Sequence, residues 1–212
     1  MIKEVCVENF TNVPLMIERG ADRIELNNDL SVGGTTPSFG VIKKTVEYTH
    51  KHDVPVIVMI RPRGGNFVYS EDELEIMIND IQICSLLGVD GVTFGCLTRE
   101  KHLDKRSMNR LLSVAHAGDL EVVMHMAFDE LTNVEQKEAI DWLSQNRIKR
   151  ILTHGGPLTQ PISHTLDHLK EVVKQAKNKI EILPGGGITK ANINKIVEQI
   201  KIKQVHGTKL LG

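Results

Sequence analysis

Cysteine is scarce in this chain, and its scarcity excludes one class of protein. The 212 residues include three cysteines, Cys6, Cys84 and Cys96. They are too few and too scattered for a disulfide framework, and no C-x-x-C pair provides a structural zinc motif. This cysteine usage indicates the reducing cytoplasm.

The chain also lacks an excess of charge of either sign, and it has no long hydrophobic run. The formal net charge is -1, so bulk electrostatics would not draw the protein to nucleic acid or to an anionic membrane. No apolar run approaches the ~20 residues that a membrane-spanning helix needs. The first ten residues, MIKEVCVENF, carry charges inside their apolar run, unlike a secretory signal. We therefore expect a cytoplasmic protein without a nucleic-acid or membrane partner.

The chain does contain a repeated pattern in which a short apolar strand is followed by an amphipathic helix. Eight strands are expected, over residues 2–7, 23–26, 56–61, 91–94, 121–125, 150–152, 180–183 and 204–206. About seven helices separate them. Capping boxes at Ser70 and Thr132 and a cap at Asp104 begin three of these helices, and Thr189 is expected to cap the last one. This alternation predicts a (β/α)8 TIM barrel forming a single domain over residues 1–212, with an open doubly wound sheet as the alternative.

The segment after the last expected strand is short. Only six residues follow His206, so the eighth outer helix should be short or absent. The outer faces of the first and last strands would then expose Val5, Val7 and Val205 to water. We expect either a homodimer or a packed-down terminal tail to cover them.

Ionisable and glycine-rich segments gather at the carboxyl ends of the expected strands, where TIM barrels place their functional groups. The third strand ends in two arginines and two glycines, and guanidinium groups at the end of a buried strand require an anionic partner. Three glycines follow the seventh strand, where backbone N–H groups can hold a phosphate or carboxylate. The expected binding residues for a small anionic ligand are Arg61, Arg63, Gly185, Gly186, Gly187 and His206.

The same strand ends provide candidate catalytic residues, namely Glu25, His125 and Asp129. Either Glu25 or His125 could act as general base and the other as general acid if burial shifts their pKa values towards neutrality. The alternative is structural, with Glu25 and Arg61 forming an ion pair inside the barrel. A nucleotide cofactor is not expected, because the helix-opening G-x-G-x-x-G motif is absent.

A metal site is a further hypothesis. Cu(I) prefers thiolate and thioether ligands. The residues that could meet at the barrel mouth to bind it are Cys6, His125 and His206, with Met126 as a thioether.

Several segments resemble the CutC family, in the same order and over essentially the whole chain. They are Glu4-Val5-Cys6-Val7, Gly20-Ala21-Asp22-Arg23-Ile24-Glu25-Leu26, Gly33-Gly34-Thr35-Thr36-Pro37-Ser38, Ile60-Arg61-Pro62-Arg63-Gly64-Gly65 and Pro184-Gly185-Gly186-Gly187-Ile188-Thr189. The family is named for copper homeostasis and adopts a TIM barrel, so the resemblance implies a cytoplasmic protein that binds copper. Family members commonly have a cysteine where this chain has Asn27, so a copper site built on two thiolates lacks its second cysteine here.

The sequence therefore supports two hypotheses about function. One is a copper-handling protein, which the family resemblance implies. The other is a TIM-barrel enzyme that acts on a small phosphorylated or carboxylated substrate, which the composition of the barrel mouth favours. A purely structural protein would have scattered charges rather than charges that converge on one end of the barrel.

Overall fold

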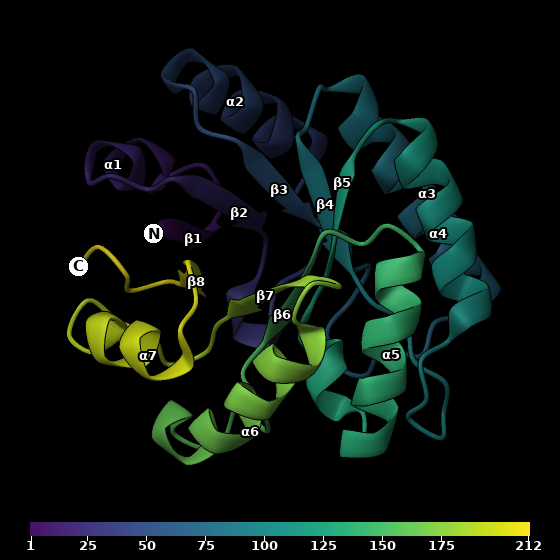
Figure 1. Cartoon of the computed structure of the whole chain (residues 1–212). Coiled ribbons are helices and arrows are strands. Elements are labelled where there is room, and N and C mark those ends of the chain that lie inside the picture. The colour runs from purple at the N-terminus through teal and green to yellow at the C-terminus, as the bar shows by residue number, and fades with distance from the viewer.

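Eight parallel strands form a barrel with helices around its outside (Figure 1). The computed structural model describes residues 1–212. The strands are β1 (Ile2–Glu8), β2 (Arg23–Asn27), β3 (Val56–Met59), β4 (Gly91–Phe94), β5 (Glu121–Met124), β6 (Arg150–Thr153), β7 (Glu181–Pro184) and β8 (Gln204–Gly207). From β1 to β7 each strand pairs with the next strand in sequence, and β8 pairs with β1. The predicted TIM barrel is confirmed.

Seven α-helices and three short 3₁₀ helices connect the strands. The α-helices are α1 (Val13–Glu18), α2 (Phe39–Thr49), α3 (Glu71–Leu86), α4 (Lys105–Ala117), α5 (Asn133–Gln145), α6 (Ile162–Ala176) and α7 (Ile193–Ile200), and the 3₁₀ helices are η1 (Leu30–Val32), η2 (His50–His52) and η3 (Met126–Glu130). None of the helices is long and apolar enough to cross a membrane.

The expected helix starts are mostly correct. Capping boxes close the first turns of α3 at Ser70 and of α5 at Thr132, and the Asp104 side chain caps α4. The prediction for Thr189 is wrong, because α7 begins four residues later. The backbone N–H of Thr189 instead donates to the Asn192 side chain, 2.8 Å away.

The hydrophobic core has two parts. The larger part lies between the outer face of the barrel and the helices and includes the fully buried Phe94 and Phe128. The smaller part consists of Ile57, Val123, Leu152 and Leu183, a separate apolar cluster contributed by four different strands. Charged and polar side chains of the other strands therefore share the barrel interior with this cluster.

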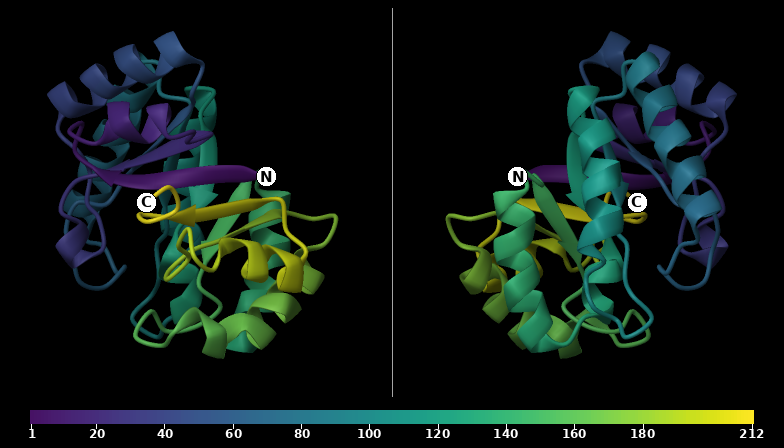
Figure 2. Two further views of the ribbon diagram at one scale, coloured as in Figure 1. Left: turned by 90° about the vertical axis from the view of Figure 1, so that its left-hand side faces the viewer. Right: turned by 90° about the vertical axis from the view of Figure 1, so that its right-hand side faces the viewer.

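No helix follows β8, in agreement with the prediction. Residues 208–212 instead pass between α1 and α7 (Figure 1), where Leu210 is buried and Lys209 forms a bridge with Thr189. β8 lies beside β1 in both views of Figure 2. Val5, Val7 and Val205 are buried within the single chain. The packed-down tail is thus present, and these three valines provide no reason for a homodimer.

The barrel has one seam without a strand ladder, between β7 and β8. Seven neighbouring pairs are joined by parallel ladders. Across the seam the Gln204 side-chain amide donates to the Glu181 carboxylate at 3.1 Å and to the Ile182 carbonyl at 3.4 Å. A side chain therefore takes the place of backbone pairing at this point.

Candidate functional site

The register of three strands brings Cys6, Glu25 and His206 together. Cys6 lies opposite Glu25 across the β1–β2 pair, and Glu4 lies opposite His206 across the β1–β8 pair. One potential ligand atom from each of Cys6, Glu25 and His206 lies within 4.8 Å of the other two, and all three residues are buried. Side chains two residues apart on a strand point to the same face, so this register puts Glu4, Cys6, Glu25 and His206 on one side of the sheet.

A network of charges lies beneath this cluster. The Glu4 carboxylate accepts a hydrogen bond from Arg23 and another from Nδ1 of His206, the latter at 2.8 Å. Burial raises the pKa of Glu4, but the hydrogen bond and charge of His206, with those of Arg23, outweigh it and hold this pKa at about 2. The charges of Glu25 and Glu4 raise the pKa of His206 in spite of its burial. Glu4 is therefore a permanent anion that orients His206.

The pKa values of Glu25 and Cys6 are both raised, and burial is the largest cause of each shift. The Glu25 carboxylate lies 3.6 Å from Nε2 of His206, which opposes the shift. The negative charge of Glu25 adds to the effect of burial on Cys6 and keeps its thiol protonated. The Asn27 amide connects the two, since it donates to Glu25 at 2.8 Å and to Cys6 Sγ at 3.4 Å.

These residues lie at the wall of a pocket of about 290 Å³ at the carboxyl end of the barrel. Of the residues expected at the site, the pocket is lined by Cys6, Glu25, Arg61, His125 and His206. The wall also contains Asn27, the thioethers Met59 and Met126, and Phe67. The structure thus joins the candidate metal ligands and several of the candidate catalytic residues in one cavity.

Arg61 lines this pocket but does not pair with Glu25. Its guanidinium donates to the carbonyls of Val32, Gly34 and Gly65, at 2.9, 3.1 and 2.6 Å. It also lies over the ring of Phe67, with 4.8 Å from Cζ to the ring centroid. The expected Glu25–Arg61 ion pair is therefore wrong. Neutral carbonyls hold Arg61 in place and leave its charge uncompensated, with Nε buried and without a partner.

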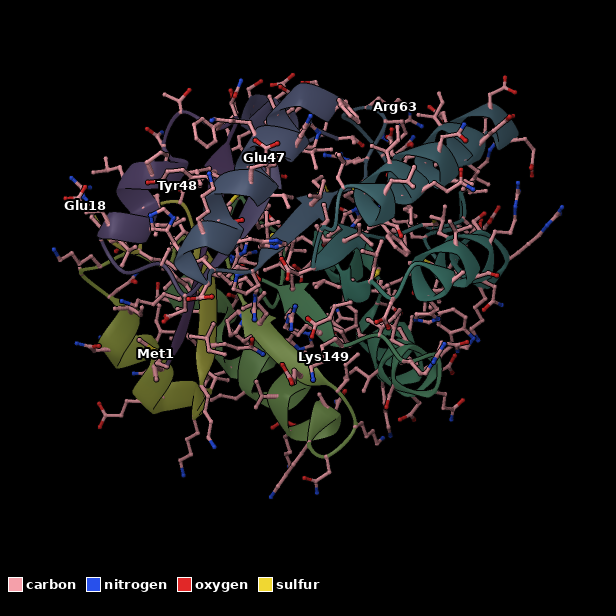
Figure 3. The ribbon with its side chains drawn as sticks, turned by 90° about the horizontal axis from the view of Figure 1, so that it is seen from above. Met1, Glu18, Glu47, Tyr48, Arg63 and Lys149 are labelled. Carbon is pink, nitrogen blue, oxygen red and sulfur yellow. The ribbon has the colours of Figure 1, made fainter.

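Arg63 belongs to the surface rather than to the pocket. It pairs with Glu73 of the α3 capping box and donates to the carbonyls of Asn66 and Val68. Figure 3 shows Arg63 towards the outside of the molecule. Its guanidinium is used to fix the loop that leads into α3, so the structure does not bring it to the expected anion site.

His125 is held as a neutral ring. Burial and the charge of Arg61 lower its pKa to about 3. Nδ1 accepts a hydrogen bond from the backbone N–H of Ala127 at 3.2 Å. The ring proton must therefore be on Nε2, which is buried without a partner in the wall of the pocket. A neutral ring with this low pKa is a hydrogen-bond donor rather than a general base.

The glycine segment 185–187 lies at the edge of the pocket, under the loop that follows β6. A Cβ atom at Gly185 would come within 2.8 to 3.1 Å of the side chains of Leu152, Met126 and His206, so a larger residue would require these side chains to shift. His154 approaches this segment, with Nδ1 at 3.1 Å from the Gly185 carbonyl and 3.0 Å from the Gly186 carbonyl. None of the three glycines lines the pocket: Gly185 packs behind wall residues of the pocket, and Gly186 packs against His154 and Leu158.

Asp129 holds the loop after β6 in place through hydrogen bonds. Its carboxylate accepts hydrogen bonds from the Thr153 hydroxyl and from the backbone N–H groups of His154 and Gly155. Burial raises its pKa to about 6 against these hydrogen bonds. Asp129 does not line the mouth pocket, so its contacts indicate positioning of the loop rather than contact with a ligand.

Some residues with notable surroundings are not predicted from the sequence. Asn27 is one of them, because no sequence motif marks a single asparagine as part of a site. His164 and His168 are another case. They lie four residues apart on α6, a helix whose first and last residues are not predicted from the sequence. Their H-x-x-x-H spacing is the signal that could have identified them.

Comparison with known proteins identifies the family of this chain. The model of the CutC family matches residues 1–211. A family protein CutC from Enterococcus faecalis is 49% identical over the full length of both chains. The human copper homeostasis protein cutC homolog is 38% identical, over 97% of this chain and 72% of its own length.

Solved structures give the same result. The crystal structure of the putative copper homeostasis protein CutC from Streptococcus agalactiae matches with a TM-score of 0.95 at 42% identity, covering 99% of each chain. Deoxyribose phosphate aldolase from Aeropyrum pernix matches with a TM-score of 0.72 at 10% identity, over 99% of this chain and 87% of its own, which shows a shared fold alone. The resemblance seen in the sequence is therefore confirmed, and the chain belongs to the CutC family.

Proposed function

We propose that this protein acts in copper homeostasis by binding Cu(I) at the Cys6–Glu25–His206 cluster. The observation that carries the proposal is the approach of a thiol, a carboxylate and an imidazole to within 4.8 Å of one another at one buried point. The printed names of its human and streptococcal relatives, which refer to copper homeostasis, support the same role.

The donor set fits a soft metal ion. Cys6 offers sulfur, and the thioethers of Met59 and Met126 line the same pocket. Cu(I) favours this kind of ligand over oxygen. The metal must displace the proton of the Cys6 thiol, and the hydrogen bond that Asn27 donates to Sγ would stabilise the resulting thiolate.

His206 is suited to be the nitrogen ligand. Its Nδ1 faces the Glu4 carboxylate, which leaves Nε2 as the atom closest to Glu25. A carboxylate behind a ligating histidine fixes its tautomer and raises its basicity. Glu4 would therefore hold the ring in place while Nε2 exchanges its proton for the metal.

A titration of the reduced protein with Cu(I) in the presence of a competing chelator tests the proposal. We expect one tight site that Cys6→Ser abolishes. Cys84→Ser is the matched control, because Cys84 is a buried thiol on α3, outside the pocket. Equal Cu(I) affinity of Cys6→Ser and the unmodified protein would rule out this site.

A second candidate function is catalysis on a small anionic substrate. It is favoured by two buried donors without partners that belong to residues of the same pocket, Arg61 Nε and His125 Nε2; the unpaired Asn27 Oδ1 beside them is an acceptor and suits a hydroxyl group of such a substrate. Buried polar atoms are normally satisfied, so a group of unsatisfied ones marks a place for a polar ligand. In this version Arg61 and His125 donate to the anion, and Glu25, whose raised pKa suits proton transfer, serves as the acid–base group.

Thermal unfolding in the presence of inorganic phosphate or small dicarboxylates tests this second function. A ligand that uses the pocket should raise the unfolding temperature of the unmodified protein and not that of Arg61→Gln. Arg63→Gln is the control, since Arg63 is an arginine of the same loop that lies outside the pocket. The absence of any shift with the whole series would count against an anion site.

A further inference from the structure

Helix α6 presents two histidines to a second cavity, separate from the mouth pocket. His164 and His168 are four residues apart within α6, which puts their side chains on one face with their Cβ atoms about 6 Å apart. Both line a polar cavity of about 280 Å³, together with residues of α5 and of the loop after β6. This cavity and the mouth pocket share no lining residue.

The contacts of His168 fix which ring nitrogen is free. The Gln136 side-chain amide donates from Nε2 to the carbonyls of Phe128 and Leu131, at 3.2 and 3.3 Å. Its Oε1 must therefore be the atom that accepts from Nε2 of His168, 2.8 Å away. With the ring proton on Nε2, the lone pair of His168 is on Nδ1. Gln136 thus orients the His168 ring through a hydrogen bond, as a residue behind a metal-binding histidine commonly does.

His164 is exposed and makes no side-chain hydrogen bond or ion pair within the protein. Its ring is therefore free to turn towards His168. The cavity wall also contains the Asp129 carboxylate and the side chains of Asn133 and Gln160. No basic side chain other than the two histidines lines the cavity, so its electrostatics do not oppose a cation.

We propose that His164 and His168 form a binding site for a divalent transition metal of the Zn²⁺ or Cu²⁺ class, with water completing the coordination. Imidazole nitrogens suit these ions and not Mg²⁺ or Ca²⁺, which require oxygen ligands. The absence of a sulfur ligand in the cavity separates this site from the Cu(I) site proposed at Cys6.

Isothermal titration of the untagged protein with ZnCl₂ tests the site, using the Cys6→Ser variant as background so that the mouth cluster loses its thiol. We expect one Zn²⁺ per chain. His164→Gln and His168→Gln should each weaken binding by more than the roughly 10- to 100-fold that loss of an outer-shell partner costs. His52→Gln is the control, since His52 is an exposed histidine on η2, away from this cavity.

Substitution of the exposed His164 should leave the fold intact, so a loss of binding in His164→Gln cannot be attributed to unfolding. Zn²⁺ affinity unchanged in both α6 variants, or reduced equally in His52→Gln, would overturn the proposal. An electron paramagnetic resonance spectrum of bound Cu²⁺ gives a second readout. It should show two coupled nitrogens in the background protein and at most one in His164→Gln. Because Cys6 is absent throughout, failure here would not affect the Cu(I) proposal.

Discussion

Glu4 is the residue on which the polar interior of the barrel depends most. It is 1% exposed and neutralises both Arg23 and His206, which are buried as well. A buried charge is tolerated only when it is paired, so removal of this carboxylate leaves Arg23 without its ion-pair partner and leaves His206 with Glu25 alone. The Cys6–Glu25–His206 cluster and the charge network would lose their order together.

Glu4→Gln is therefore expected to lower the free energy of unfolding by about 3–5 kcal/mol, the cost of breaking a buried ion pair. Urea unfolding at pH 7 measures this change. Glu71→Gln is the control, because Glu71 forms an ion pair with Arg110 but is 69% exposed. Its loss should cost no more than about 1 kcal/mol.

The pH dependence of the same pair of proteins provides a separate prediction. The pKa of Glu4 is about 2 in the folded protein and 4.5 in the absence of these contacts. A lowered pKa stabilises the folded state above the unfolded value, and this contribution is lost as the pH falls towards the folded value. The difference in stability between the unmodified protein and Glu4→Gln should therefore shrink between pH 4.5 and pH 2. A constant difference over this range would contradict the assigned pairing.

Helix starts are the elements that local sequence determines most fully. The Ser70 hydroxyl accepts from the backbone N–H of Glu73, and the Glu73 carboxylate accepts from that of Ser70. These groups are close in the chain, so the motif can be identified before the fold is known. At Thr189 only half of this arrangement is present, because its backbone N–H donates to the Asn192 side chain but its hydroxyl caps no helix, and α7 begins at Ile193.

Ser70→Ala should lower the free energy of unfolding by about 1 kcal/mol through loss of the cap on α3. Chemical unfolding followed by circular dichroism measures the change. Ser113→Ala, an exposed position inside α4, is the comparison and should remain within about 0.5 kcal/mol. If both variants behaved alike, the cap would contribute nothing.

At the scale of the whole molecule, the barrel is completed by its tail rather than by an eighth helix. Leu210 is 2% exposed and belongs to the main core cluster, although it lies outside any helix or strand. Its side chain covers part of the surface that an eighth helix would otherwise shield. A short tail therefore contributes to the closure of the fold.

Leu210→Ala should cost about 2–5 kcal/mol, as for other leucines deleted from a packed core. Leu86→Ala, at a leucine that is 85% exposed on α3, should change the stability by no more than about 0.5 kcal/mol. Thermal unfolding and light scattering of both variants would measure stability and association together. A tail that is only loosely attached would give the two variants equal stability.

The sequence by itself determined the order of strands and helices and favoured the barrel over an open sheet, whereas the β1–β8 pairing of the tertiary structure decided it. The alternation of apolar and polar residues with periods of two and about 3.6 is a local property, as are the capping boxes. Local alternation also put Cys6, Glu25 and Arg61 on the inner faces of their strands. The order of the motifs along the chain was sufficient to indicate the CutC family, because each motif can be identified without knowing its neighbours in space.

Only the tertiary structure decided which partner each polar group has. Arg61 contacts carbonyls of distant loops rather than Glu25, and Arg63 turns outward to Glu73. His125 is neutral because burial and the charge of Arg61 act on it together. These outcomes depend on distances between segments far apart in the chain and on the loss of water around them. The spacing of residues along the sequence specifies neither these distances nor this loss of water.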